Sequence, residues 1–110
     1  MKRTNEFSIL DPALFDREVT VYHREGLTRR LLERVYFMQT QGLDRNLGRE
    51  EESGDFLLVI PGDDPIAPGD LVAAGEGPDL LTRDTQTATV HSVRKCCFMG
   101  KVSHVEARGN

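Results

Sequence analysis

The sequence predicts an all-β protein, a small single-domain β-barrel or sandwich of about six strands. Short runs of β-branched, aromatic and aliphatic residues recur along the chain, and turns containing glycine or proline separate them. That spacing is typical of barrels and sandwiches. A chain of 110 residues also suits one domain with one small core, which buries roughly two thirds of the unfolded surface. We divide it into an N-terminal arm with a helical turn, residues 1–16, and a β-barrel-like domain, residues 17–110.

Two apolar runs, residues 56–60 and 71–74, lie at the centre of this prediction. Neither has a 3.6-residue rhythm, and Pro-Gly pairs bound them, so both are predicted to be buried strands. The segment between them is expected to fold back over the end of the sheet as a tight acidic corner that joins the two strands. In that corner Asp63, Asp64 and Asp70 can accept hydrogen bonds from turn amides.

The N-terminal third of the chain begins with a polar arm, residues 1–8. Asp11-Pro12 then resembles the start of a helix, with proline at the first helical position, and predicts a single helical turn. Residues 17–24 alternate between two faces and predict the first full strand. The pair Glu25-Gly26 is expected to form a hairpin turn after it.

Residues 27–38 fit both a helix and a strand by periodicity. We favour a strand, because no N-cap residue precedes the segment and its end, residues 35–37, is strongly strand-prone. The polar stretch 39–54 is longer than the roughly 12–15 residues usual for an unstructured connection. It is therefore expected to be a long flexible loop, either functional or mobile.

The C-terminal part predicts two more strands, residues 87–93 and 102–107. In the first, Ala88 and Val90 are expected to face one side and Val93 the other. Residues 95–101, which include both cysteines, are expected to form the turn between these strands.

Composition excludes several classes of function. The net charge is −4, which argues against a nucleic-acid binder held by a general positive field. No run approaches the ~18 apolar residues of a membrane span, and the start has no apolar stretch of signal-peptide length, so we expect a cytoplasmic protein with no membrane partner. Neighbouring cysteines such as Cys96 and Cys97 rarely reach disulfide geometry, so both are expected to be reduced.

The candidate chemical residues favour no reaction. His23, His91 and His104 each lie inside a predicted strand without Cys-x-x-Cys or His-x-x-x-His spacing, so we expect them to face solvent or pair locally rather than bind a metal. The adjacent cysteines have no sequence-local base and are interpreted as small residues of a turn. No Gly-x-Ser-x-Gly or phosphate loop occurs. We therefore predict no catalytic residue, no cofactor and no metal ligand.

A local basic cluster is the one candidate contact surface. It consists of Arg24, Arg29, Arg30 and Arg34, and the acidic run Glu50, Glu51 and Glu52 follows it in the chain. On one molecule this is a solvated surface. In a ring of identical subunits, the basic strand of one could face the acidic loop of the next as a heterologous contact, which is a hypothesis.

The order of elements resembles a family of small β-barrel proteins of tailed phages, the head–tail joining, head-completion (stopper) and minor capsid proteins. The resembling residues run from 17 to 108 and are Val19-Thr20-Val21-Tyr22, residues 56–60, Ile66-x-Pro68-Gly69-Asp70-x-Val72 with Gly75, Val90-x-Ser92-Val93 and His104-x-Glu106. Relatives often carry an Asp-Asn-Arg type of turn where this chain has Lys95-Cys96-Cys97-Phe98. These are fold-forming residues and include no catalytic motif.

The resemblance implies a virion structural protein or its prophage copy, made in the host cytoplasm and carried in the virion. Its partners would be neighbouring head–tail proteins and copies of itself in a ring, with a monomer in isolation. The loop 39–54 would line a DNA channel, with passive DNA contact only. Two rivals stand beside this interpretation: an adaptor that binds a peptide or nucleic acid through Tyr22, Tyr36 and Phe37, and a small enzyme that uses His91 or His104.

Overall fold

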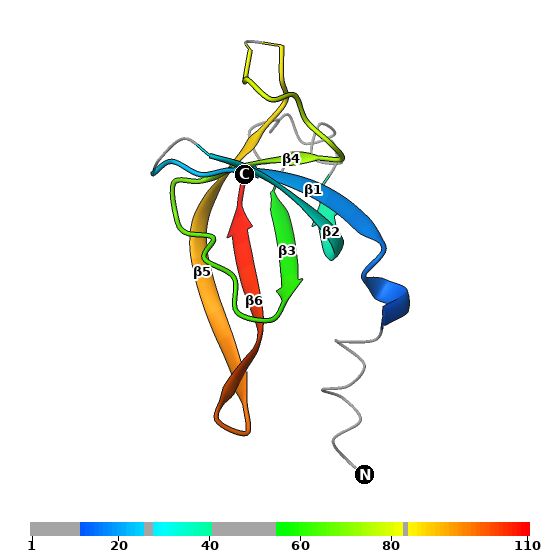
Figure 1. The fold of residues 1–110 in the computed structure, drawn as a ribbon, viewed down its shortest axis with the longest axis vertical. Helices are drawn as coiled ribbons and strands as arrows, with labels where there is room; N and C mark the ends of the chain where they lie inside the picture. Colours follow the sequence, from blue (N-terminus) through cyan, green and yellow to red (C-terminus); the bar gives the residue numbers. More distant parts are fainter. Residues whose placement is uncertain (1–11, 26–27, 41–54, 83) are drawn as a thin grey trace, which may run out of the picture.

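The protein is a closed six-stranded antiparallel β-barrel with strand order β1-β2-β3-β6-β5-β4, which confirms the predicted fold class (Figure 1). The computed structural model describes residues 12–25, 28–40, 55–82 and 84–110. The elements are a single 3-10 turn η1 (Pro12–Leu14), β1 (Arg17–Tyr22), β2 (Arg29–Gln39), β3 (Phe56–Pro61), β4 (Leu71–Ala74), β5 (Ala88–Phe98) and β6 (Lys101–Gly109).

The segment 27–38, which fits both a helix and a strand by periodicity, is a strand from Arg29 onward. This strand, β2, pairs with β1 on one side and with β3 on the other. These two ladders satisfy its backbone amides and carbonyls without a helix. The β1–β2 register shifts between Arg17 and Val19, and on the facing strand Arg34 has a φ of 63°, so the ladder carries a bulge there. The strand also continues to Gln39, so the predicted loop begins later than expected, and residues 41–54 lie outside the described part of the chain.

Alternate residues of all six strands point inward and form the core. Its fully buried members include Val19, Val21, Leu58, Val72, Val90 and Val105. Phe37 and Phe56 add a tilted ring pair with centroids 5.8 Å apart. Ile66 comes from the connection between β3 and β4 rather than from a strand, is 3% exposed, and belongs to the same core cluster.

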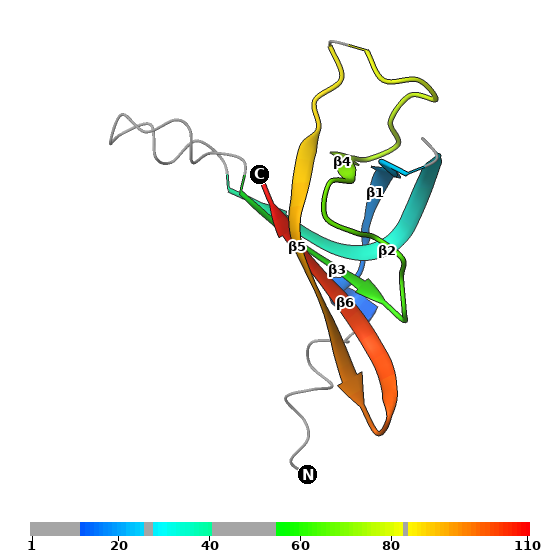
Figure 2. The same ribbon diagram turned by 90° about the vertical axis from the view of Figure 1, so that its left-hand side faces the viewer.

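Two of the three aspartates in the acidic corner accept turn amides as predicted, whereas Asp63 pairs with Lys95. The corner also does not join neighbouring strands. The carboxylate of Asp64 accepts the amide of Ile66 at 2.9 Å, and that of Asp70 accepts the amide of Ala67 at 3.0 Å. However, β3 and β4 are far apart in the strand order, because β6 and β5 pair between them. The connection therefore crosses the barrel and hydrogen-bonds to Val90 of β5 through residues 69 and 70. Figure 2 shows this crossing.

The predicted turn over residues 95–101 was wrong. β5 continues to Phe98, and the turn is only Met99-Gly100, with φ values of 55° and 80°. Two positive φ values in a two-residue loop match the twist of a hairpin, so both strands can extend to the turn. A register shift between Val90 and Ser92 also turns Val93 toward the core, against the predicted face.

The β5–β6 hairpin extends beyond the barrel (Figures 1 and 2). Pairing with β4 ends at Thr89 of β5, and pairing with β3 ends at His104 of β6. We call residues 95–103 the hairpin arm, because there the two strands pair mainly with each other. Among the described residues, no other strand pairs with β5 beyond Val90.

Candidate assembly interface

Arg30 belongs to a hydrogen-bond network that connects the acidic corner to β1 and β2. Its guanidinium makes two hydrogen bonds to the Asp64 carboxylate, at 2.7 and 3.1 Å, and donates through Nε to His23 Nε2 at 2.8 Å. Because Nε2 accepts, the His23 proton is on Nδ1, which donates to the buried Asp70 carboxylate at 2.9 Å. The same carboxylate accepts the Arg24 amide. The charged groups of Arg30, Asp64 and Asp70 therefore stabilise the folded chain through contacts within it.

Arg29, on the other face of β2, is also held within the chain. Its guanidinium donates to the Gly77 carbonyl at 2.7 and 3.2 Å and lies 3.6 Å from Glu76. The hydroxyl of the fully buried Thr20 donates to the Gly75 carbonyl and accepts the Gly77 amide, at 2.7 and 2.8 Å. The segment after β4 is thereby fixed against the outside of β1 and β2.

The predicted arginine cluster therefore divides. Arg29 and Arg30 are half-buried and use their donors inside the chain, whereas Arg24 and Arg34 are exposed. The proposed acidic counterpart, Glu50 to Glu52, lies outside the described residues. A contact between this run and the arginines of a neighbouring subunit stays a prediction, and the exposed pair is best placed to make it.

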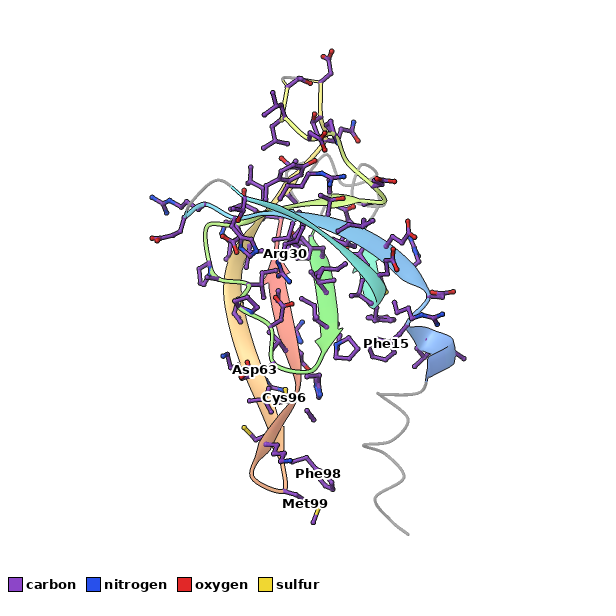
Figure 3. The ribbon with its side chains drawn as sticks, in the orientation of Figure 1. Phe15, Arg30, Asp63, Cys96, Phe98 and Met99 are labelled. Carbon is purple, nitrogen blue, oxygen red and sulfur yellow. The ribbon has the colours of Figure 1, made fainter. Side chains whose placement is uncertain are left out.

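The tip of the hairpin arm exposes two large apolar side chains that are neighbours in the sequence, one at the end of β5 and one in the turn. Phe98 is 42% exposed and Met99 is 84% exposed, and both stand at the far end of the molecule in Figure 3. Nearer the barrel, Lys95 pairs with Asp63 of the acidic corner at 2.8 Å. That hydrogen bond is the main reason why the pKa of Lys95 is raised.

A second exposed apolar pair lies at the opposite end of the molecule, in the loop between β4 and β5 (Figure 1). Leu80 is 79% exposed and Leu81 is 40% exposed. Together with Tyr22 and Leu71 they line a groove of about 490 Å³, with Arg24 at its side. The two ends of the barrel thus present different apolar surfaces.

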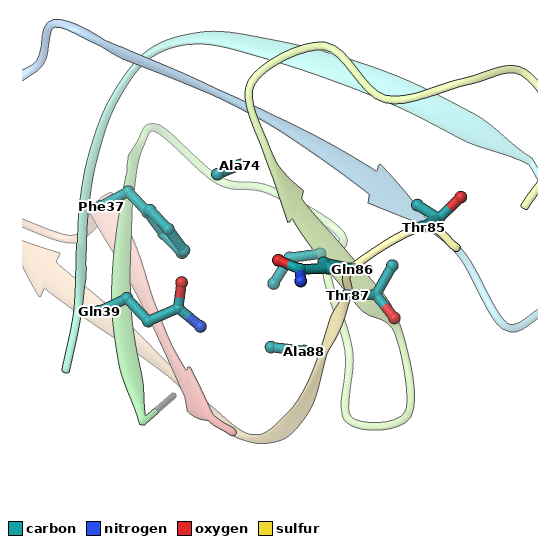
Figure 4. A pocket seen from close by; sticks show the side chains of 8 residues that line it. Phe37, Gln39, Ala74, Thr85, Gln86, Thr87 and Ala88 are labelled. Atoms are coloured by element: carbon teal, nitrogen blue, oxygen red, sulfur yellow. The ribbon is translucent and has the colours of Figure 1, made fainter. Parts of the chain in front are cut away.

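The mouth of the barrel on this side forms a second hollow, of about 470 Å³ (Figure 4). Phe37 and Gln39 of β2 face Gln86 and Ala88 across it. Amide and hydroxyl groups surround a small apolar floor, and the described residues that line it include no charged side chain. Such a lining offers hydrogen-bond donors and acceptors.

Of the three aromatic residues considered for a base-stacking platform, Tyr36 is partly exposed. Tyr22 and Phe37 are buried and cannot form a stacking platform for bases. His23 pairs locally with Asp70, and exposed His91 pairs with Asn110 at 2.7 Å, as predicted for strand histidines. His104 also pairs locally, because its Nδ1 lies 2.9 Å from the Ser103 hydroxyl, although it is buried, at 8% exposure.

Sequence reasoning missed the apolar tip. Assigning residues 95–101 to a turn hid the fact that Phe98 ends a strand and Met99 occupies the turn itself. The signal was Gly100, because glycine is favoured at the second position of a two-residue type I′ hairpin loop.

In comparisons with known proteins, no family model matches the chain, and neither a curated protein nor a solved structure matches it. Within the described part of the chain, no helix has the length and apolar character needed to cross a membrane.

Proposed function

We propose that this chain is a structural subunit of the tailed-phage virion, or its prophage copy, which acts in a head–tail connector or minor capsid ring and catalyses no reaction. The observation that carries the proposal is the hairpin arm. It extends past a closed barrel and exposes Phe98 and Met99 at its tip. The family resemblance of residues 17–108 supplies the biological setting.

A closed barrel limits how subunits can join. Because each strand has two partners in the barrel, most strand edges are already paired and cannot template another chain. The β5 edge beyond Val90, which continues into the arm, is not paired with a second strand of the described chain, and the arm adds an apolar tip. A neighbouring subunit that covers both would bury apolar area worth roughly 25 cal/mol per Å².

The arrangement suits a head-to-tail contact. The arm and the Leu80–Leu81 loop lie at opposite ends of the molecule (Figure 1), so one subunit can present a different surface to each neighbour. Contacts between unlike surfaces form a ring when the rotation closes. Exposed Arg24 and Arg34 would face Glu50–Glu52 of the next subunit. The net charge of −4 on each subunit would repel DNA that passes through the ring.

The test compares the wild-type chain with the double variant Phe98→Thr/Met99→Asn. Threonine keeps a strand-prone residue, and asparagine tolerates positive φ in the turn, so the variant should fold. Native mass spectrometry over a range of concentrations, alone and with extracts of prophage-induced cells, should show rings or connector complexes for the wild type only. Particles purified from the same cells should contain the wild-type chain.

Two results would overturn the proposal: absence of the chain from purified particles, or equal incorporation of the double variant. The Arg–Glu contact has its own test, in which reversing the charges of Glu50, Glu51 and Glu52 together should weaken assembly steeply at low salt. Assembly that does not respond would reject that contact while leaving the arm in place.

A peptide-binding adaptor is the second candidate, and the groove beside Tyr22 and Leu81 favours it. An adaptor of this kind would bind as a monomer and would not need the arm. It would retain its partner in the Phe98→Thr/Met99→Asn variant, whereas a ring subunit would lose assembly.

A further inference from the structure

Strands β5 and β6 bring three potential metal ligands to one face of the hairpin. Cys96 lies directly opposite His104 in the register, and Glu106 follows two residues along β6, on the same face as His104. The thiol, imidazole and carboxylate donor atoms all lie within 4.8 Å of one another. Figure 3 shows Cys96 on β5, between the barrel and the tip of the arm.

The hydrogen bonds of His104 leave one of its nitrogens ready to bind an ion. The hydroxyl of Ser103 donates to the Cys96 carbonyl at 3.1 Å, so its oxygen accepts from His104 Nδ1 at 2.9 Å. The proton of a neutral imidazole is therefore on Nδ1, and Nε2 keeps its lone pair. A hydrogen bond of this kind at the second nitrogen is the usual way of orienting a metal-binding histidine.

Nε2 of His104 is the one buried side-chain nitrogen or oxygen among the described residues that has no hydrogen-bond partner. Its residue is 8% exposed. Glu106 Oε2 lies 3.5 Å from it, which is too long for a good hydrogen bond. A lone pair and a carboxylate that face each other in a buried setting repel unless a proton or a metal ion lies between them.

We propose that Cys96 Sγ, His104 Nε2 and Glu106 Oε2 form a binding site for a zinc-type transition-metal ion. The thiolate, neutral imidazole and carboxylate are the three ligand types that zinc takes in proteins, at about 2.0–2.3 Å. Tetrahedral geometry at those lengths separates the donors by roughly 3.3–3.8 Å, a range that includes the 3.5 Å between Nε2 and Oε2. A water molecule would complete the four-coordinate shell.

The surrounding charges fit this assignment. A thiolate and a carboxylate together neutralise a divalent ion. The other oxygen of Glu106 lies 3.4 Å from Arg94 and 3.8 Å from Arg108, and this contact turns Oε2 toward His104. Both guanidinium groups are mostly exposed, at 71% and 61%, so water and salt screen their repulsion of the metal.

A metal site is favoured over a catalytic cysteine. The barrel-mouth hollow and the apolar groove are lined by other residues, so neither delivers a substrate to Cys96. The free imidazole nitrogen also faces a carboxylate, which is an arrangement that a cation completes.

The test is a titration of the reduced full-length chain with Co²⁺, followed by displacement with Zn²⁺. A thiolate–cobalt charge-transfer band and tetrahedral d–d bands should saturate at one ion per chain, and native mass spectrometry should give the same stoichiometry. Cys96→Ser and Glu106→Gln should remove or strongly weaken binding. Ser103→Ala should weaken it by about 10- to 100-fold, because only the orientation of the imidazole is lost.

Matched controls separate this site from chance binding. Cys97→Ser removes the neighbouring exposed thiol, and His91→Asn removes an exposed histidine, and both should bind as the wild type does. The proposal is overturned if the wild type gives no thiolate band, if Cys97→Ser loses the band as Cys96→Ser does, or if two chains share one ion. The first of these outcomes does not depend on whether any variant folds.

Discussion

The barrel body and the hairpin arm belong to one continuous sheet but are stabilised in different ways. In the body, Val19, Leu58 and Val105 are completely buried, and the network around Asp70 fixes the crossing connection. In the arm, Phe98 and Met99 are largely exposed. There the strands are held by their own ladder, a two-residue turn and the exposed Lys95–Asp63 pair.

This difference separates stability from recognition. The free energy of unfolding depends mainly on apolar burial in the body. Side chains on the arm can change with little effect on the core, so the arm is where a binding surface can be adapted. The body in turn sets the direction in which the arm points, because β5 and β6 continue from the barrel as unbroken strands.

The largest effect should come from the core of the body. Leu58→Ala should lower the free energy of unfolding by about 2–5 kcal/mol, because it deletes buried methyl groups and leaves a cavity. Leu57→Ala, on the opposite face of the same strand and partly exposed, should cost about 1 kcal/mol. Urea denaturation of both variants measures the contrast, and equal losses would contradict the assigned faces of β3.

A smaller effect is expected at the corner network. Asp70→Asn should cost about 1–3 kcal/mol, because an amide cannot accept all the donors that its buried carboxylate now accepts, from His23, Ala67 and Arg24. Asp63→Asn, in the same corner but exposed, is the control and should change stability little. If the two variants lost stability equally in thermal or urea unfolding, the network would have no special role.

The turn of the arm should respond in the opposite direction. Met99→Asn should raise the free energy of unfolding by a few tenths to about 1 kcal/mol, since methionine is strained at a φ of 55° and asparagine is not. Gly100→Ala, at a φ of 80°, should destabilise. A loss of stability in Met99→Asn would mean that Met99 packs on the body, against its 84% exposure.

The smallest effect is expected at the exposed ion pair of the arm. The pKa of Lys95 is raised from 10.5 by Asp63, so the folded state favours the ammonium form. That contribution is fully present below the ordinary pKa and is lost as the pH rises through the raised value. From pH 6 to 9 the denaturation midpoints of wild type and Lys95→Met should therefore run parallel, and converge only above about pH 10.5. If the difference between the midpoints of wild type and Lys95→Met changed between pH 6 and 9, the pH dependence would belong to another group.

Most of the strands could be predicted from the sequence. The run 71–74 was predicted with the same bounds as β4, and 56–60 lacks only the last residue of β3. These segments succeed because apolar runs bounded by Pro-Gly pairs have few alternatives. Residues 95–98 failed because Lys, Cys and Cys carry no strong local preference, and their strand exists through pairing with β6.

The candidate site was less accessible to sequence reasoning. Four arginines close together in the chain suggested one surface, but β2 turns Arg29 and Arg30 to different partners on its two faces. The cysteines were set aside because no base lies near them in sequence, yet the register places His104 opposite Cys96.

The amino-acid sequence by itself determined the all-β class, the acidic corner and the position of nearly every strand, because alternation, β-branching and turn residues act over a few neighbouring positions. Only the tertiary structure decided that the sheet closes, that β3 and β4 are separated by two strands, and that a thiol, an imidazole and a carboxylate meet. These outcomes depend on which strands pair and in which register, and a shift by one residue would turn every side chain to the opposite face.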